Sequence, residues 1–124
     1  MTYDVVFVDS PDDEKLAKCY SLADLFIFAS WYEGWSLPPL EAMACGTPVV
    51  VTDCKGIRDY VIHNYNALVV PPRDIKALAE ASIKLLTNSE LTTSLRNGGL
   101  KTAKELTWDK VVERFEHAIR EFVG

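Results

Sequence analysis

Residues 25–51 read LFIFASWYEGWSLPPLEAMACGTPVVV, and this stretch decides the fold class. It begins and ends with a short apolar run of the kind that forms a strand buried on both faces. Between the two runs, Pro38 and Pro39 suit the first turn of a helix and Gly46 suits its end. A strand, a helix and a second strand in this order predict a parallel pair of strands joined by a crossover helix.

Similar apolar runs recur along the chain, and segments with helical spacing separate them. The runs are residues 5–8, 25–28, 49–51 and 67–70. Each run is apolar on successive residues instead of alternating, which is typical of a parallel sheet covered by helices on both sides. The sequence therefore predicts one α/β domain over residues 1–124, with a parallel sheet of about four strands between helices.

Helix-start residues follow several of these runs. Residues 10–13 (SPDD) combine Ser10 as an N-cap with a proline and two acids in the first turn. Asp74 and Thr107 are expected to cap two further helices, and Ser89 to start a helix that breaks at residues 97–99 (NGG). Two apolar stripes are expected to pack in the core: Ile75, Leu78, Ala79, Ile83 and Leu86, then Trp108, Val111, Val112, Phe115, Ile119 and Phe122.

Composition excludes several classes of function. The 124 residues are 48% hydrophobic and 25% charged, as in an ordinary globular domain. A net charge of −5 argues against a nucleic-acid partner and against attraction to anionic lipid, and no transmembrane segment is present. The cysteines at positions 19, 45 and 54 match no metal-ligand spacing. We expect reduced, mostly buried thiols in a cytoplasmic protein.

Two carboxylates lie on either side of the central turn. Glu33 and Glu41 have seven residues between them, and the Gly-bearing turn from 33 to 37 follows the second apolar run directly. Ligands of open parallel sheets bind beyond the carboxyl ends of the strands, which is where this turn belongs. Backbone N–H groups at a turn that opens into a helix favour an anion, and the carboxylates suit sugar or ribose hydroxyls. The pattern predicts a nucleotide-sugar site.

The chain resembles the C-terminal, donor-binding domain of the retaining glycosyltransferases of family 4, which have a B-type fold of two Rossmann-like domains. The resemblance is carried by residues 23–30, 33–41, 46–51, 56–59 and 66–74, and by the helix starts after Asp74 and at Thr107-Trp108. It implies a partial Rossmann-like three-layer domain and transfer of a hexose, with retention, from a nucleotide diphosphate sugar. It implies no cofactor and no metal held by a protein carboxylate pair.

The resemblance also implies roles for individual residues. Glu33 is the expected catalytic residue, through contact with the hydroxyls of the transferred sugar, and Glu41 is expected to accept hydrogen bonds from the ribose hydroxyls. The backbone N–H groups expected to bind the donor are those of Gly34, Trp35 and Ser36 toward the sugar and of Leu37 toward the diphosphate.

Some features depart from the family. Ser36 stands where many relatives have glycine, and Arg58-Asp59 stands where many have Pro-Glu. The family's acceptor domain, and two strands whose region supplies an Arg and a Lys to the diphosphate, are not in these residues. We therefore expect the isolated chain to lack transferase activity. Residues 5–8 and 25–28 are expected either to pair directly or to pair between two chains, as a homodimer through the exposed sheet edge.

Alternatives stay open at this stage. The chain could be a non-catalytic remnant or interaction module that keeps the fold, whereas a flavodoxin-like signalling domain would need more acids after the first strand. The aromatic side chains at positions 31, 32 and 35 suit either sugar stacking or anchoring of the turn. Lys55 and Arg58 suit a phosphate contact or surface ion pairs, while His63 and His117 are expected on the surface. The last apolar stripe is core or contacts the family's other domain.

Overall fold

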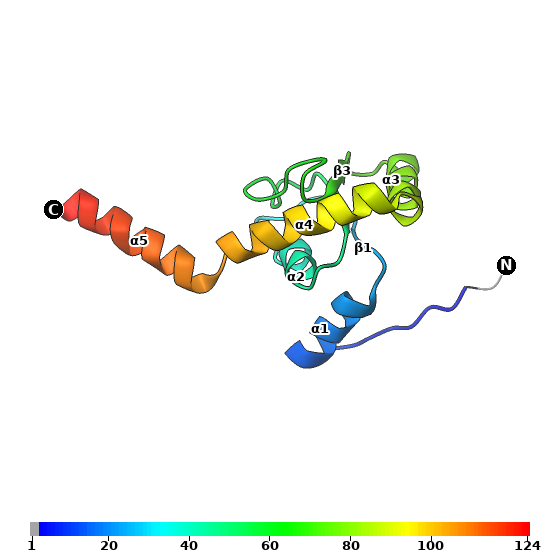
Figure 1. The fold of residues 1–124 in the computed structure, drawn as a ribbon, viewed down its shortest axis with the longest axis horizontal. Helices are drawn as coiled ribbons and strands as arrows, with labels where there is room; N and C mark the ends of the chain where they lie inside the picture. The colour runs from blue at the N-terminus through cyan, green and yellow to red at the C-terminus, as the bar shows by residue number, and fades with distance from the viewer. Residues whose placement is uncertain (1–2) are drawn as a thin grey trace.

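The structure, a computed structural model, describes residues 3–124. Helices and strands alternate in its first half, and three helices follow (Figure 1). The elements are α1 (Asp13–Leu22), β1 (Phe26–Phe28), α2 (Pro38–Ala44), β2 (Val49–Thr52), β3 (Leu68–Val70), α3 (Ile75–Thr87), α4 (Ser89–Glu105) and α5 (Trp108–Val123).

The sheet is parallel throughout, with strand order β1-β2-β3. Phe26 pairs with Val49, and Val50 pairs with Leu68. The predicted parallel sheet and α/β class are confirmed. The sheet has three strands instead of about four, because one of the predicted runs forms no strand in the described residues.

Strand β2 forms the centre of the core, and its side chains alternate between two clusters. Val49 and Val51 pack in a cluster with Met43 of α2, whereas Val50 packs with Leu85 of α3 and Leu95 of α4. All three valines are fully buried. Because successive strand residues point to opposite faces, helices cover the sheet on both sides. The predicted helix–sheet–helix layering is confirmed.

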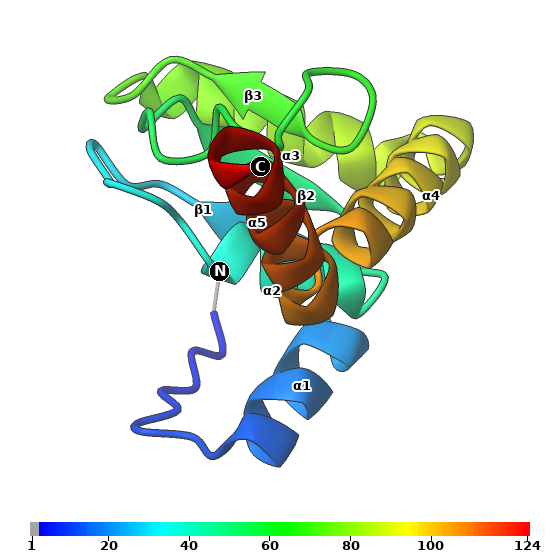
Figure 2. The ribbon, with the colours of Figure 1, turned by 90° about the vertical axis from the view of Figure 1, so that its left-hand side faces the viewer.

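Residues 5–8 are not a strand, which corrects the prediction made from their composition. Their side chains are exposed, to 92% for Phe7, and the segment runs outside the sheet (Figures 1 and 2). The expected direct pairing with residues 25–28 is also absent in the described chain, since β1 pairs with β2 alone. An apolar run becomes a strand only where a neighbouring strand takes its backbone hydrogen bonds.

Helix α4 continues through the glycines at which a break was predicted. It runs without interruption from Ser89 to Glu105. Both Gly98 and Gly99 are buried there, and α4 packs against α2 and against the segment before β3. A Cβ at Gly98 would overlap the carbonyl oxygen of Tyr65, and one at Gly99 would lie 3.1 Å from Cγ of Met43. The glycines allow close packing of a helix instead of ending it.

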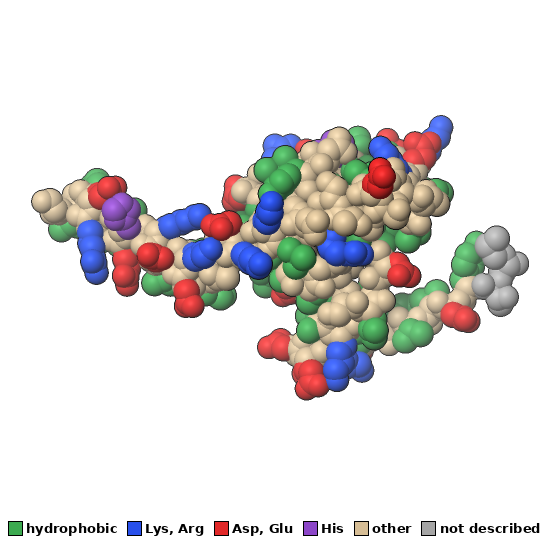
Figure 3. All heavy atoms as spheres, viewed as in Figure 1, with side chains coloured by type: hydrophobic (Ala, Val, Ile, Leu, Met, Phe, Trp, Pro, Cys, Tyr) green, Lys and Arg blue, Asp and Glu red, His purple; other side chains and the backbone are tan. Residues whose placement is uncertain are grey.

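Helix α5 contradicts the expectation that its apolar stripe is core. None of its residues is buried, Phe122 is 94% exposed, and the helix projects away from the sheet (Figures 1 and 2). Charged side chains lie along the same projecting helix (Figure 3). Within residues 3–124, no helix combines the length and apolar character needed to cross a bilayer.

Helix α3 is in the predicted place but buries a different face. Its buried residues are Ser82 and Leu85, whereas Ile83 and Leu86 of the predicted stripe are exposed. Of that stripe, only Leu78 packs at the edge of the core. Apolar residues occur at helical spacing on two neighbouring faces of this helix. The face around Leu85 is the one that packs against β2, β3 and α4.

The helix starts follow the predictions with one shift of position. The side chains of Asp74 and Thr107 accept hydrogen bonds from the first turns of α3 and α5, as predicted. Helix α4 begins at Ser89 as predicted, with Asn88 as its cap, whereas the cap of α1 is Asp12 instead of Ser10. Each cap satisfies an N–H group that the first helical turn leaves without a partner.

The cysteines are free, as expected, but they are not mostly buried. Cys54 is buried, Cys45 is partly exposed and Cys19 is exposed. Cys19 is exposed on α1, which packs mainly against α2.

Candidate functional site

Two loops meet at the carboxyl edge of the sheet. The backbone N–H of Glu33, in the β1–α2 loop, donates to the carbonyl of Cys54, and that of Ser36 donates to the carbonyl of Gly56, both at 2.9 Å. A Cβ at Gly56 would lie 2.7 Å from the carbonyl oxygen of Glu33, closer than real Cβ atoms approach. Glycine at this position therefore lets the loop after β2 support the loop that carries Glu33.

Three N–H groups of the β1–α2 loop stay available. No hydrogen bond within residues 3–124 takes those of Gly34, Trp35 or Leu37. The N–H of Ser36, also expected to face a ligand, is already bound to Gly56. Helix α2 is short and begins with Pro38, so the loop amides are the principal donors at this edge.

Tyr60 contacts both Ser36 and Trp35 and holds this part of the loop in place. The Tyr60 hydroxyl donates to the carbonyl of Ser36, which is buried, and the rings of Tyr60 and Trp35 lie 5.4 Å apart. Burial raises the pKa of Tyr60, so its hydroxyl keeps the proton that it donates. The contact of Trp35 with Tyr60 favours the interpretation that this aromatic side chain anchors the turn. The Ser36 hydroxyl lies 3.6 Å from the sulfur of Cys54, which suits a role of Ser36 in supporting the loop.

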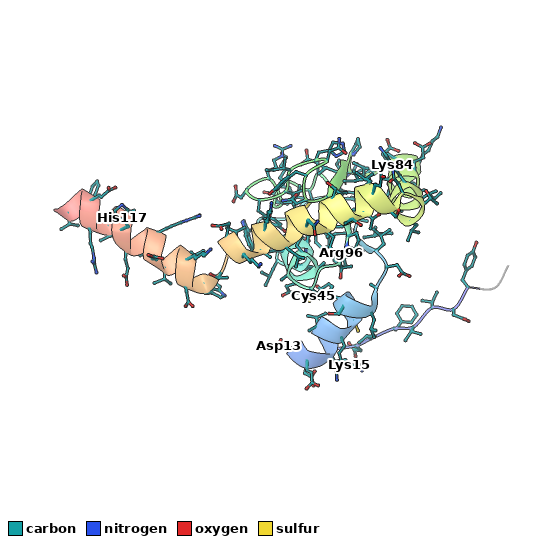
Figure 4. All side chains as sticks on the ribbon, in the orientation of Figure 1. Asp13, Lys15, Cys45, Lys84, Arg96 and His117 are labelled. Atoms are coloured by element: carbon teal, nitrogen blue, oxygen red, sulfur yellow. The ribbon has the colours of Figure 1, made fainter. Side chains whose placement is uncertain are left out.

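Two of the cations at this edge, Arg58 and Arg73, have partners within the chain, whereas Lys55, whose backbone pairs with that of Glu33, is exposed and makes no ion pair within residues 3–124. Arg58 makes a two-pronged hydrogen bond to Asp53, which lowers the pKa of that carboxyl, as the ion-pair alternative predicts. Arg73 lies with its guanidinium 4.1 Å from the centre of the Trp31 ring. His63 and His117 are both exposed, as expected; His117 lies far along α5 (Figure 4).

The two predicted carboxylates lie in different surroundings. Glu33 is half-buried, and its Oε1 accepts a hydrogen bond of 3.0 Å from the Ser30 hydroxyl, which ties the carboxylate to the end of the segment after β1. Glu41 lies in the first turn of α2 and faces α1, where the Tyr20 hydroxyl donates to its Oε2 at 2.9 Å. The structure thus places one carboxylate in the loop and the other in the helix, facing α1.

Tyr20 is not among the site residues that the sequence predicts. It is buried, and its hydroxyl reaches Glu41 across 21 residues of sequence. One signal was present: a tyrosine hydroxyl that enters a core needs a hydrogen-bond partner, and an acid is an obvious one.

Comparison with known proteins identifies the family. Residues 3–102 match the family described as Glycosyl transferases group 1. A D-inositol 3-phosphate glycosyltransferase of Jonesia denitrificans is 35% identical over 105 residues, which are 85% of this chain and 25% of that protein. The chain thus spans about a quarter of the length of the curated relatives that it matches.

Solved structures agree with this assignment. A sucrose-phosphate synthase from Thermosynechococcus elongatus superposes with a TM-score of 0.84 at 34% identity, over 95% of this chain and 30% of that one. The Anabaena protein HepE, solved in complex with UDP-glucose, shares the fold with a TM-score of 0.74 at 21% identity, over 86% of this chain and 30% of that one. The chain belongs to the group 1 family of glycosyltransferases.

Proposed function

We propose that this chain binds the nucleotide diphosphate sugar of a retaining glycosyltransferase reaction. The observation that carries the proposal is the set of free loop amides at Gly34, Trp35 and Leu37, which lie between Glu33 and Glu41 in the sequence. Amides bind the oxygens of a phosphate or a sugar, and carboxylates accept from sugar hydroxyls. Family membership, and the UDP-glucose bound by the related fold of HepE, support the same ligand class.

Each group has a separate task in this proposal. Glu33 accepts from hydroxyls of the transferred sugar, while the amides of Gly34 and Trp35 donate to it. The amide of Leu37 donates to the diphosphate, whose negative charge grows as the bond to the sugar breaks. Glu41 accepts from the ribose, and the sugar is transferred with retention at its anomeric carbon. The position of the amides ahead of α2 supports this order along the donor.

We further propose that these 124 residues alone bind the donor without transferring the sugar. Transfer requires positive charge on the leaving diphosphate, and electrostatic stabilisation is usually the largest contribution to such catalysis. Arg58 is committed to Asp53, and Arg73 lies over Trp31. In the family, the region of two further strands of the donor-binding domain would supply the positive charge, and the acceptor domain would bind the acceptor.

A titration followed by nuclear magnetic resonance tests donor binding. Adding UDP or GDP to the labelled chain is expected to shift backbone signals of residues 34–41 first, with weak, millimolar affinity, because neutral loop amides provide most of the contacts. Glu41→Gln should weaken this binding, whereas Glu80→Gln, an exposed acid on α3, should leave it unchanged. Shifts confined to other segments, with residues 34–41 silent, would contradict the proposal.

A second function, as an interaction module, is favoured by one specific observation. Within residues 3–124, β1 pairs on one side alone, and the apolar residues 5–8 lie outside the sheet and exposed. A free strand edge and an unpaired apolar segment complement each other when they come from two molecules. We propose a homodimer in which residues 5–8 of one copy add to β1 of the other.

Sedimentation measures that association directly. The wild-type chain is expected to sediment as a dimer, and Phe7→Pro as a monomer, because proline lacks the N–H that a strand donates. Phe122→Lys, on the exposed face of α5, should remain dimeric. This control shows whether residues 5–8 or the apolar face of α5 forms the dimer contact. A wild-type chain that is monomeric at all concentrations would rule out the homodimer.

A further inference from the structure

The hydrogen bond between Tyr20 and Glu41 uses only one of the two oxygens of the Glu41 carboxylate. The Tyr20 hydroxyl donates to one carboxylate oxygen, Oε2, at 2.9 Å. No hydrogen bond within residues 3–124 engages the other oxygen, Oε1 of Glu41. One oxygen of the carboxylate is therefore fixed and the second remains an acceptor.

Three elements hold the Tyr20 side chain in place. Tyr20 is 8% exposed, and its ring meets that of Phe26 on β1 edge to face, with centroids 5.3 Å apart. Its backbone carbonyl accepts a hydrogen bond from the Thr47 hydroxyl, just after α2. α1 thus carries the tyrosine, while β1 and the segment before β2 fix its position. A donor held in this way can orient its partner instead of following it.

The carboxylate opens onto a pocket between α1 and α2. The pocket measures about 340 Å³, and Leu16, Tyr20, Glu41 and Cys45 are among its lining residues. In Figure 4, Cys45 lies where these two helices face each other. Burial, with a further contribution from Glu41, raises the pKa of Tyr20, so the hydroxyl remains a donor throughout the physiological range.

We propose that Tyr20 is a positioning residue, which holds Oε2 of Glu41 so that Oε1 accepts a hydrogen bond from a ribose hydroxyl of a nucleoside diphosphate. This inference rests on the proposed function, because it assigns the source of ribose selectivity within the same site. A carboxylate that rotates freely loses entropy when it binds, whereas one held by Tyr20 has already lost it. The tyrosine hydroxyl itself need not touch the ligand.

Tyr20→Phe is the decisive variant, because it keeps the ring against Phe26 and removes the hydroxyl alone. The affinity of the chain is measured for UDP and for GDP, each beside its 2′-deoxy analogue, from the shifts of residues 34–41. Wild-type protein is expected to prefer the ribonucleotide. In Tyr20→Phe the ribonucleotide affinity should fall by about threefold to tenfold, as for one lost hydrogen bond, and the preference should shrink toward one.

Tyr60→Phe is the matched control. It also removes one buried tyrosine hydroxyl, which donates to Ser36 instead of Glu41. It should lower thermal stability about as much as Tyr20→Phe while keeping the ribo-to-deoxy ratio of the wild type. In the double variant Tyr20→Phe/Glu41→Gln the loss should be no greater than in Glu41→Gln alone, because Tyr20 acts through Glu41.

The outcomes separate this inference from the proposed function. If the wild type binds UDP and GDP through residues 34–41 but Tyr20→Phe keeps the wild-type ratio, the positioning role is wrong and donor binding stands. A loss of equal size for ribo and deoxy ligands would also overturn it, since that is the effect of general loosening. If the wild type binds neither nucleotide, donor binding fails and this role fails with it.

Discussion

Gly98→Ala is expected to lower the free energy of unfolding by about 3 kcal/mol, toward the upper end of the usual cost of overpacking. In an exposed helix the same change would stabilise by about 1 kcal/mol, because alanine is the better helix former. The sign reverses here because the new Cβ would overlap the carbonyl oxygen of Tyr65.

The segment around Tyr65 cannot easily move away from α4. Asn66 is buried beside it, and its amide nitrogen donates to the carbonyl of Tyr60 at 2.7 Å and to the hydroxyl of Thr102, on α4, at 2.9 Å. Its amide oxygen accepts from the N–H of Ile62. Relieving the overlap would break these buried hydrogen bonds, each of which is costly to leave unmade.

The neighbouring Gly99→Ala provides the control within the same helix. Its Cβ would meet Cγ of Met43 at 3.1 Å, and a methionine side chain is flexible enough to shift. We expect a change of about 1 kcal/mol or less, of either sign, once the gain in helix propensity is included. Urea unfolding of both variants measures the difference, and equal stabilities would show that Gly98 is not a contact point.

Leu85→Ala is expected to destabilise the fold by about 3 kcal/mol, within the range for large-to-small changes in a core. Leu85 is 3% exposed and packs with Val50, Leu68 and Leu95, at the junction of the sheet with α3 and α4. The free energy of unfolding of a folded protein is only about 5–15 kcal/mol, so a loss of this size should clearly lower the melting temperature.

Ile83→Ala, two residues earlier in the same helix, should change stability by about 0.5 kcal/mol or less. Ile83 is 60% exposed, although the hydrophobic pattern of the sequence assigns it to the core. Comparing the two variants tests which of these residues is buried, the one in the structure or the one that the hydrophobic pattern assigns to the core. Both changes introduce alanine into the same helix, so their effects on helix propensity are similar. A large loss for Ile83→Ala and a small one for Leu85→Ala would mean that α3 is rotated about its axis.

Local chemistry explains what could be predicted of the fold and the site. The runs that become β1, β2 and β3 are apolar on successive residues. Asp74 and Thr107 mark helix starts through side chains that cap the first turn, and Pro38 does so through its fixed backbone angle. Glu33 and the loop amides could be placed because a loop after a parallel strand lies at the ligand edge of the sheet. The hydroxyl of Tyr20 at Glu41 could not be placed, because that contact depends on how α1 packs against α2.

The sequence alone indicated the family and the order of the elements from α1 onward, and it predicted a site from Glu33 to Glu41. These features depend on residues close together in the chain. Only the tertiary structure decided which apolar residues are buried. Residues 5–8 and the stripe of α5 are as apolar as a core segment, but no element within residues 3–124 buries them. Gly98 looks like a helix breaker in the sequence, but the segment at Tyr65 packs closely against it. Whether a residue is buried depends on the segment that packs against it as much as on its own side chain. The spacing of apolar residues along the chain does not specify which segment that is.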